Sequence, residues 1–204
     1  VFELKEAGVD NSDLTLDGYI GFLERCLDVI GESPYLVGGC QGAWAAFILR
    51  CCNPERTKST YVNLVGPLDF GAGAGAIKKN CRQAGPEYFH QVVDCNGGLQ
   101  PGWVQWLSFA GMAPAYFWWE RYRNLFWGLV EMNCRQNPKP VKKWITERNW
   151  MDSPRNLPGP WFKQVVKDLF IGNKLVKGVL RIRGKLVDLT RIKWRILAIA
   201  GGAD

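Results

Sequence analysis

Tyr35-Leu36-Val37-Gly38-Gly39-Cys40-Gln41-Gly42 is the stretch that decides the fold we expect for this chain. Its first three residues are apolar and predict a short buried strand. The Gly-x-Cys-x-Gly that follows is the pattern of a nucleophile elbow, with a thiol where a hydroxyl is usual. Small residues at Gly38 and Gly42 let the strand and the next helix approach closely around a sharp turn. We therefore expect the Cys40 side chain at the top of a sheet and at the start of a helix.

The surroundings of Cys40 suit a reactive thiolate. A helix N-terminus carries partial positive charge, which stabilises a negatively charged sulfur. The backbone N–H of Gln41 would supply half of an oxyanion hole, the donors that stabilise a tetrahedral intermediate. A thiolate is a strong nucleophile and suits a thioester substrate, so the pattern favours acyl transfer through a thioester on Cys40.

Length and composition indicate one globular domain. The chain has 204 residues, of which 47% are hydrophobic and 22% are charged, and this is enough for a full core. Its seven cysteines show no paired Cys-x-x-Cys spacing, and Cys51 is adjacent to Cys52. This usage favours reduced thiols in a cytoplasmic protein over a disulfide framework or a metal site. Charged residues interrupt both the first six positions and the apolar stretch 112–130, so we expect neither a signal peptide nor a membrane span.

Positive charge is concentrated late in the sequence. The formal net charge is +7. Residues 174–195 contain one acidic residue, Asp188, and the basic residues there are Lys174, Lys177, Arg181, Arg183, Lys185, Arg191, Lys193 and Arg195. A solvated pair of edge strands explains such a run. The functional alternative is attraction of an anionic ligand such as a coenzyme A phosphate. Nucleic acid is not an expected partner, because no recognisable nucleic-acid module accompanies the charge.

Periodicity and capping residues place the first elements. Apolar residues at helical spacing predict a helix over 15–30, which Thr15 caps and Gly31 ends. We also expect a strand end at 1–4, a helix at 42–52, and strands at 35–37 and 59–65. Strands that alternate with helices in short succession predict a parallel α/β sheet.

The pattern changes after Phe70. Residues 74–170 predict helices separated by Gly and Pro, and aromatic residues concentrate there, including Trp103, Trp106, Tyr116, Phe117, Trp118, Trp119, Tyr122, Phe126, Trp127, Trp144, Trp150 and Trp161. We interpret this segment as a helical cap inserted between strands of the sheet. Its aromatics would individually form the core of the cap, and together they would form an apolar lid over the elbow.

Sheet structure is expected to resume after the cap. Residues 179–182 and 185–187 predict a hairpin, and residues 195–200 predict a buried strand. The expected organisation is a core with the elbow at 1–72, the helical cap at 73–172, and a return to the core at 173–204.

A Gly-Ala repeat at Gly71-Ala72-Gly73-Ala74-Gly75-Ala76 loosely fits a phosphate-binding loop. It follows Pro67 and Asp69 rather than a strand directly, and no suitable acid lies about 20 residues further on within a βαβ unit. We interpret it as a flexible crossover into the cap.

Several landmarks occur in an order that matches a known family. They are the cysteine box Gly38–Gly42, Leu68-Asp69-Phe70, the segment 149–161 with Asn156-Leu157-Pro158-Gly159, then Asn173-Lys174-Leu175, Val187-Asp188-Leu189 and the final Gly201-Gly202-Ala203-Asp204. Together they resemble the catalytic domain of polyhydroxyalkanoate synthases, across nearly the whole chain. The resemblance implies an α/β-hydrolase fold, here a partial and mostly parallel sheet with a helical, aromatic-rich cap.

The resemblance also implies a mechanism and partners. A 3-hydroxyacyl group would move from coenzyme A to Cys40, and the hydroxyl end of another acyl unit would then attack the thioester. Asp204 would orient a histidine base, which is expected beyond Asp204, so the chain is expected to be an internal fragment of a longer enzyme. Coenzyme A is a substrate in this scheme, with no cofactor or metal. A homodimer and a polyester granule surface are the partners that the resemblance suggests.

Some positions depart from the synthase pattern and keep other functions open. Ala43 stands where the family usually has a second Gly, and Gln41 stands where synthases usually carry an aliphatic residue. A polyester depolymerase or acyl-thioester hydrolase would use the same Cys40, with water as the attacking group. A non-catalytic binding protein is a third possibility, because the one histidine, His90, lies in the cap and precedes Asp204. Asp69 is an alternative to Asp204 as the acid.

Overall fold

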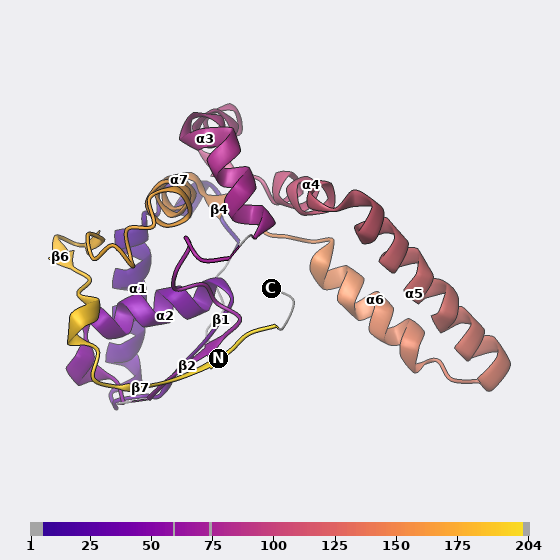
Figure 1. Cartoon of the computed structure of the whole chain (residues 1–204), viewed down its shortest axis with the longest axis horizontal. Coiled ribbons are helices and arrows are strands. Elements are labelled where there is room, and N and C mark those ends of the chain that lie inside the picture. The colour runs from indigo at the N-terminus through magenta and orange to yellow at the C-terminus, as the bar shows by residue number, and fades with distance from the viewer. Residues whose placement is uncertain (1–5, 59, 74, 202–204) are drawn as a thin grey trace.

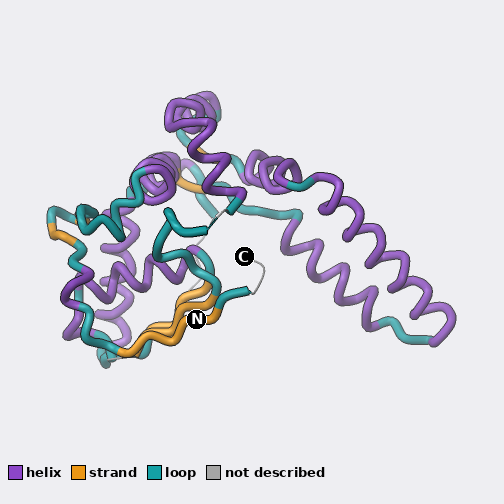
Figure 2. Tube along the Cα trace, viewed as in Figure 1, coloured by secondary structure: helices purple, strands orange, loops and turns teal. Residues whose placement is uncertain are grey.

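A computed structural model of the chain describes residues 6–58, 60–73 and 75–201. Figure 1 shows a body in which helices lie on one side of a small sheet, and a long helical hairpin that extends away from this body. The strands of the sheet lie together at one edge of the body, and helices make up most of the rest (Figure 2). The mixture of helices with a parallel sheet confirms the α/β class expected from the sequence.

Three parallel strands form the sheet. Tyr61 in the central strand pairs with Leu36 on one side and with Ile196 on the other. The strands predicted at 35–37 and 59–65 are confirmed, with ends that differ by one or two residues. In spatial order the strands are β1 (Leu36–Gly39), β2 (Thr60–Leu64) and β7 (Arg195–Ile199).

The first helix begins and ends at the residues that the sequence indicates. α1 spans Leu16–Ile30. The Thr15 hydroxyl oxygen accepts a hydrogen bond from the Gly18 backbone N–H (3.1 Å), which satisfies one of the donors left free at a helix start. Gly31 follows the helix with φ 71°, a left-handed conformation that glycine adopts at low cost. Local chemistry therefore sets the length of α1.

The second helix, α2 (Gln41–Cys52), packs directly on β1 and β2, and it also contacts α1. The Tyr61 hydroxyl donates to the Ala43 carbonyl oxygen (2.6 Å), which ties the central strand to the first turn of α2. Burial raises the pKa of Tyr61, so this hydroxyl keeps its proton. The largest fully buried side chains around α2 are Trp44, Tyr61, Leu16, Ile20 and Ile48.

The opposite face of the sheet is exposed. Val37, Val62 and Leu197 lie side by side in register on this face, and Val37 and Leu197 are 62% and 54% exposed. The expectation of a buried strand at 195–200 is wrong, because every residue of β7 is exposed. β7 lies at the edge of the sheet, whereas α2 covers β1 and β2.

Residues 76–171 are mainly helical, as predicted. α3 is kinked at Gly85 (φ 73°), directly before Pro86. Within this segment, a two-residue antiparallel ladder joins β3 to β4. The elements are α3 (Ala76–Cys95), β3 (Leu99–Gln100), α4 (Gly102–Met112), α5 (Pro114–Arg135), α6 (Lys139–Met151), β4 (Leu157–Pro158), α7 (Gly159–Gln164) and the π-helix η3 (Val165–Ile171). Short 3₁₀ turns lie elsewhere at Val9–Asn11, Pro54–Arg56 and Leu189–Arg191.

Helices α5 and α6 form the hairpin that extends from the body in Figure 1, and we call this hairpin the arm. Its base is held by Asp152, which pairs with the Arg121 guanidinium and accepts a hydrogen bond from Trp106 Nε1 (3.0 Å). Burial of Asp152 opposes its ionisation, but the hydrogen bonds from Arg121 and Trp106 outweigh this effect and lower the pKa of the carboxyl. The Trp144 ring N–H donates to the Arg121 carbonyl oxygen (3.0 Å), which joins α6 to α5.

Many aromatics of the arm are on its surface. Trp119 is 66% exposed, and Tyr122 and Phe126 are each 59% exposed. At 100° per residue these three positions share the side of α5 that faces away from α6, whereas the buried Gly128 faces α6. The interpretation of the individual aromatics as cap core is therefore wrong for this stripe, because no helix among the described residues packs over it.

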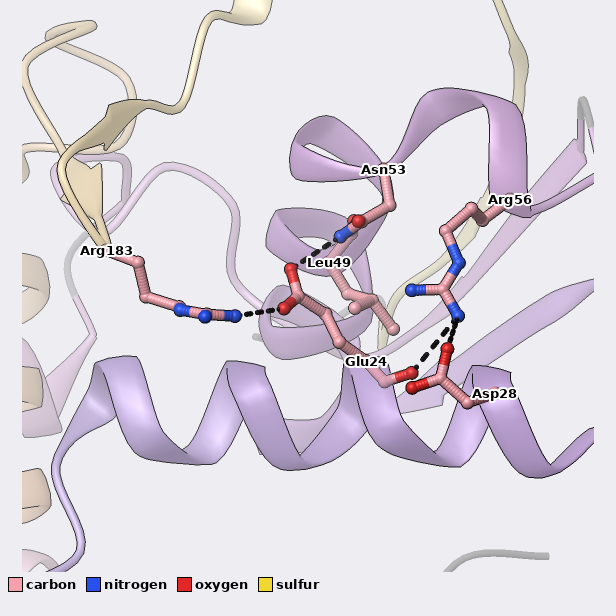
Figure 3. A network of polar contacts seen from close by, with 6 residues as sticks. All are labelled: Glu24, Asp28, Leu49, Asn53, Arg56 and Arg183. Atoms are coloured by element: carbon pink, nitrogen blue, oxygen red, sulfur yellow. Dashed lines mark hydrogen bonds and ion pairs between the residues drawn. The ribbon is translucent and has the colours of Figure 1, made fainter.

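The predicted hairpin is confirmed as β5 (Arg181–Ile182) and β6 (Lys185–Leu186). Figure 3 shows how it is joined to α1: the Glu24 carboxylate pairs with Arg183 and accepts a hydrogen bond from Asn53 Nδ2 (2.9 Å). In the same network Arg56 pairs with Asp28 and donates to the Glu24 carbonyl oxygen (3.3 Å). Arg183, one of the basic residues in the run 174–195, thus has a structural partner.

Candidate functional site

Cys40 lies at the junction of β1 and α2. It is exposed and precedes Gln41, the first residue of α2. Its φ of 50° and ψ of −119° are strained for a residue with a side chain. The Cys40 N–H donates to the Leu64 carbonyl oxygen (2.9 Å), and its own carbonyl oxygen accepts from the Ala43 N–H (3.1 Å). This strand–turn–helix geometry is the one that the elbow pattern predicts.

Two glycines allow the close approach around this turn. A Cβ on Gly38 would lie 2.4 Å from the Ala43 Cα, so strand β1 could not pass α2 with any other residue there. A Cβ on Gly66, in the loop after β2, would lie 2.1 Å from the Ala43 Cβ and 2.8 Å from the Cys40 carbonyl oxygen. A Cβ on Gly42 would meet no atom within 4 Å. The crowding predicted at Gly38 and Gly42 therefore falls on Gly38 and Gly66.

The loop after β2 is held beside Cys40 by Asn63. The Gly66 N–H donates to Asn63 Oδ1, and Asn63 Nδ2 donates to the Gly66 carbonyl oxygen, both at 2.9 Å. Val65 between them adopts φ 51°, which is costly for a β-branched residue. Sequence reasoning missed this loop, although a polar Asn inside an apolar strand was a usable signal.

An apolar cleft of about 780 Å³ opens at Cys40. Cys40, Gln41 and Val65 are part of its lining, and α3, α4, α7 and η3 supply most of the remaining wall. The described residues that line the cleft include no Asp, Glu, Lys or Arg. The volume is that of a small-molecule site, and the lining suits an uncharged, mostly apolar group.

The cleft holds a second thiol, Cys81 on α3. It is 7% exposed, and burial raises the pKa of this thiol to about 11, so it stays protonated at neutral pH. Cys40 is exposed and lies at the N-terminus of α2. Of the two thiols in the cleft, Cys40 is exposed at a helix start, whereas Cys81 has the surroundings of a buried apolar residue. All seven cysteines of the chain are free.

Gln41, the residue expected to donate its backbone N–H to an oxyanion, directly follows Cys40 as the first residue of α2. Its backbone N–H is one of the first four of α2, which have no intrahelical partner. The residue also lines the cleft beside Cys40. A carbonyl oxygen of a group bound on the Cys40 sulfur could therefore accept from this N–H.

The candidate acids and the histidine are placed differently. Asp204 lies outside the described residues. Asp69 Oδ1 accepts from Asn173 Nδ2 (2.8 Å) and from the Gly71 N–H (2.7 Å), and these bonds lower the pKa of Asp69. His90 lies on α3 with its Nδ1 3.9 Å from a Glu87 carboxylate oxygen, and it is not among the residues that line the cleft. Neither His90 nor Asp69 is among the described residues that line the cleft at Cys40.

The Gly-Ala loop is not arranged as a phosphate cradle. Lys78 Nζ donates to the carbonyl oxygens of Gly71 (2.9 Å), Ala72 (3.2 Å) and Gly73, so the loop directs its acceptors toward a cation. A phosphate site directs N–H groups at its ligand instead. This geometry agrees with the interpretation of the loop as a crossover into α3.

The part of the chain that the structure describes shows neither a membrane-spanning helix nor a cluster of metal ligands. No helix there is both long and apolar enough to cross a bilayer. No group of three or more His, Cys, Asp or Glu side chains there is arranged to hold a metal ion.

Comparison with curated proteins finds relatives named "Poly(3-hydroxyalkanoate) polymerase subunit PhaC". The protein of Thiocystis violacea is 24% identical over 93% of this chain and 52% of its own length. The proteins of Synechocystis and Haloferax mediterranei are 28% and 26% identical, over 94% and 95% of this chain. They are matched over 51% and 39% of their own lengths, so the chain spans about half or less of these relatives.

These relatives support the resemblance to polyhydroxyalkanoate synthases found in the sequence. A match to a family model shows which family the chain belongs to. The chain is related to PhaC proteins along almost its whole length. The model described as "Protein of unknown function (DUF3141)" matches residues 20–204, which include the elbow, the arm and β7. The chain therefore belongs to the family of proteins of unknown function DUF3141.

Proposed function

We propose that this chain carries the nucleophile of a polyhydroxyalkanoate synthase-like acyltransferase with an α/β-hydrolase fold. Cys40 would accept 3-hydroxyacyl groups from coenzyme A and pass them to a growing polyester. The observation that carries the proposal is the position of Cys40, on a strained turn at the N-terminus of α2 and in the lining of an apolar cleft without charged side chains. Relatives named as poly(3-hydroxyalkanoate) polymerase subunits support the choice of reaction.

The proposed first step transfers the acyl group to the enzyme. The Cys40 thiolate attacks the thioester carbonyl carbon, and the backbone N–H of Gln41 stabilises the oxyanion that forms. The bond between the acyl carbon and the coenzyme A sulfur then breaks, and coenzyme A leaves as a thiol after taking a proton. Thiol exchange of this kind is nearly balanced in energy, so no other co-reactant is required.

The proposed second step forms the ester. The terminal hydroxyl of another acyl unit attacks the thioester on Cys40, loses its proton to a base, and the Cys40 sulfur leaves. We assign the base to a histidine that Asp204 orients, by the resemblance alone. An apolar cleft that keeps water away from the thioester would favour ester formation over hydrolysis.

The test supplies 3-hydroxybutyryl-coenzyme A to the complete protein that contains this chain and follows coenzyme A release, polymer and free acid. We expect coenzyme A release with polymer formation, and we expect an acyl group on Cys40 by intact mass. Cys40→Ala should lower the rate of coenzyme A release by about 1000-fold or more, because no other thiol in the cleft is nucleophilic. The matched control is Cys81→Ala, which removes the other cleft thiol and should keep the activity.

Two results would redirect the proposal. Release with free hydroxy acid and no polymer would assign the chain to hydrolases of polyesters or acyl thioesters. Activity that survives Cys40→Ala would remove Cys40 from the mechanism. The homodimer and the granule surface stay expectations, which sedimentation of the full chain with and without polyester would check.

A further inference from the structure

Asn63 is a buried polar residue in the central strand of the sheet. It is 4% exposed and pairs in register with Gly38 of β1. Burying a carboxamide is costly unless its oxygen and its NH₂ group are both paired. Both groups bond to one residue, Gly66, which lies three positions further on in the loop after β2. The side chain of Asn63 thus stabilises this loop rather than the apolar core around it.

The loop after β2 needs such contacts to keep its shape. Val65 adopts φ 51°, a left-handed conformation that is costly for a β-branched residue. The Val65 N–H donates to the Ile199 carbonyl oxygen (2.7 Å), and the two bonds of Asn63 hold the next residue, Gly66. A strained residue persists only where its surroundings hold it. Asn63 and β7 together supply those surroundings.

The same loop supports the turn at Cys40. The Cys40 N–H donates to the Leu64 carbonyl oxygen (2.9 Å), directly before Val65. A Cβ on Gly66 would lie 2.8 Å from the Cys40 carbonyl oxygen, so the Gly66 backbone lies against the turn. Cys40 is itself strained, at φ 50° and ψ −119°. The two strained residues, Cys40 and Val65, are therefore coupled through Leu64 and Gly66.

We propose that Asn63 is a positioning residue for the acyl-transfer reaction at Cys40. By fixing the loop after β2, it keeps the Cys40 turn and the Gln41 backbone N–H in the arrangement that stabilises an oxyanion on the bound acyl group. Asn63 acts through the backbone rather than by contact with the substrate, since it is not among the described residues that line the cleft. This inference rests on the proposed function, because it names a residue that supports the same nucleophile.

The test measures the rate at which 3-hydroxybutyryl-coenzyme A acylates Cys40 in the complete protein that contains this chain. Asn63→Leu keeps the size of the side chain and removes both bonds. It should lower the maximal rate roughly 10- to 100-fold, because a small displacement of a reacting group has effects of this size. The KM should stay close to the wild-type value, because the described lining of the cleft does not include Asn63. Alkylation of Cys40 by iodoacetamide, which needs no oxyanion donor, should change little.

Asn53 provides a matched control at the other end of α2. It is 8% exposed, and its Nδ2 donates to the Leu49 carbonyl oxygen (3.2 Å) and to Glu24 Oε1 (2.9 Å). Asn53→Leu removes buried hydrogen bonds of the same kind, so it should also lower stability. It should leave the maximal acylation rate of the folded protein unchanged, because Asn53 follows the last residue of α2, whereas Cys40 precedes the first.

Two further variants separate positioning from a loss of folding. Asn63→Asp keeps the shape of the side chain and an acceptor for the Gly66 N–H, so it should retain more of the rate than Asn63→Leu. Adding Val65→Gly to Asn63→Leu should restore part of the lost rate, because glycine adopts a left-handed conformation at low cost.

The outcomes separate the two proposals. If wild-type Cys40 is acylated and Asn63→Leu keeps the maximal rate, or Asn53→Leu lowers it equally, the assignment of Asn63 is wrong and the nucleophile stands. If 3-hydroxybutyryl-coenzyme A does not acylate wild-type Cys40, the proposed function fails and the assignment of Asn63 fails with it.

Discussion

Helices α2 and α5 both carry tryptophan, but only the tryptophan of α2 is buried. Trp44 on α2 is 1% exposed, and its ring stacks on that of Trp161. Trp119 on α5 is 66% exposed, on the side of the helix that faces away from α6. The same residue type is thus core in the body and surface in the arm. Aromatic content therefore does not show which helix carries the fold, and only the neighbours of each helix do.

The largest expected effect tests how tightly the body is packed at the elbow. Gly38→Val should lower the free energy of unfolding by more than about 4 kcal/mol or prevent folding, because its Cβ would lie 2.4 Å from the Ala43 Cα. Gly111→Ala is the control near the arm, since a Cβ there meets no atom within 4 Å. We expect a change below about 1 kcal/mol for it by urea denaturation. A stable, fully folded Gly38→Val would mean that β1 and α2 are less closely packed.

The next effect compares the two tryptophans directly. Trp44→Ala should cost about 3–5 kcal/mol, because it removes a large buried ring and leaves a cavity. Trp119→Ala should change stability by less than about 0.5 kcal/mol, since the ring is mostly in water. Thermal or urea unfolding of both variants gives the two values. An equal cost for Trp119→Ala would break the comparison, because the outer face of the arm would then be covered in solution.

A smaller effect tests what holds the arm to the body. Asp152→Asn should cost about 1–3 kcal/mol, because it removes a charged acceptor from Arg121 and Trp106. Asp94→Asn is the matched control: Asp94 also pairs with a cation, Lys163, but its side chain is 66% exposed. An exposed pair of this kind contributes less than about 1 kcal/mol. Equal costs for the two variants would show that the Asp152 pair gains nothing from its partial burial.

The pH dependence of Asp152 has a definite sign. Its pKa is lower in the folded protein than in the unfolded chain, so ionised Asp152 stabilises the fold above the unfolded value of about 3.9. This contribution is lost as the pH falls below that value and through the folded pKa. The stability difference between wild type and Asp152→Asn should therefore shrink between pH 6 and pH 3. A difference that stays constant over this range would contradict the ion pair.

Features that depend on nearby residues were predictable from the sequence. Thr15 and Gly31 bound α1 because capping and a left-handed glycine are properties of a few adjacent residues. The strand–turn–helix around Cys40 was predictable for the same reason, since Gly38 and the following helix lie within one turn of it. The hairpin about Arg183-Gly184 was also found, because turn residues mark it locally.

Features that depend on distant residues were not predictable. The close contact at Gly66 exists because β2 ends beside Ala43, more than 20 positions earlier. β7 has an apolar pattern like that of a buried strand, yet it lies at the exposed edge of the sheet. Trp119 is the same residue type as Trp44, but it lies on the arm, which extends away from the body and leaves it exposed.

By itself the sequence determined the elbow, the caps, the hairpin and the relation to PhaC proteins, because each is written in short segments of adjacent residues. The tertiary structure alone decided which surfaces are buried and what surrounds Cys40. The cleft is assembled from α3, α4, α7, η3 and the loop after β2, which are far apart in the sequence. Burial and pairing are properties of neighbours in space, and long-range packing sets them.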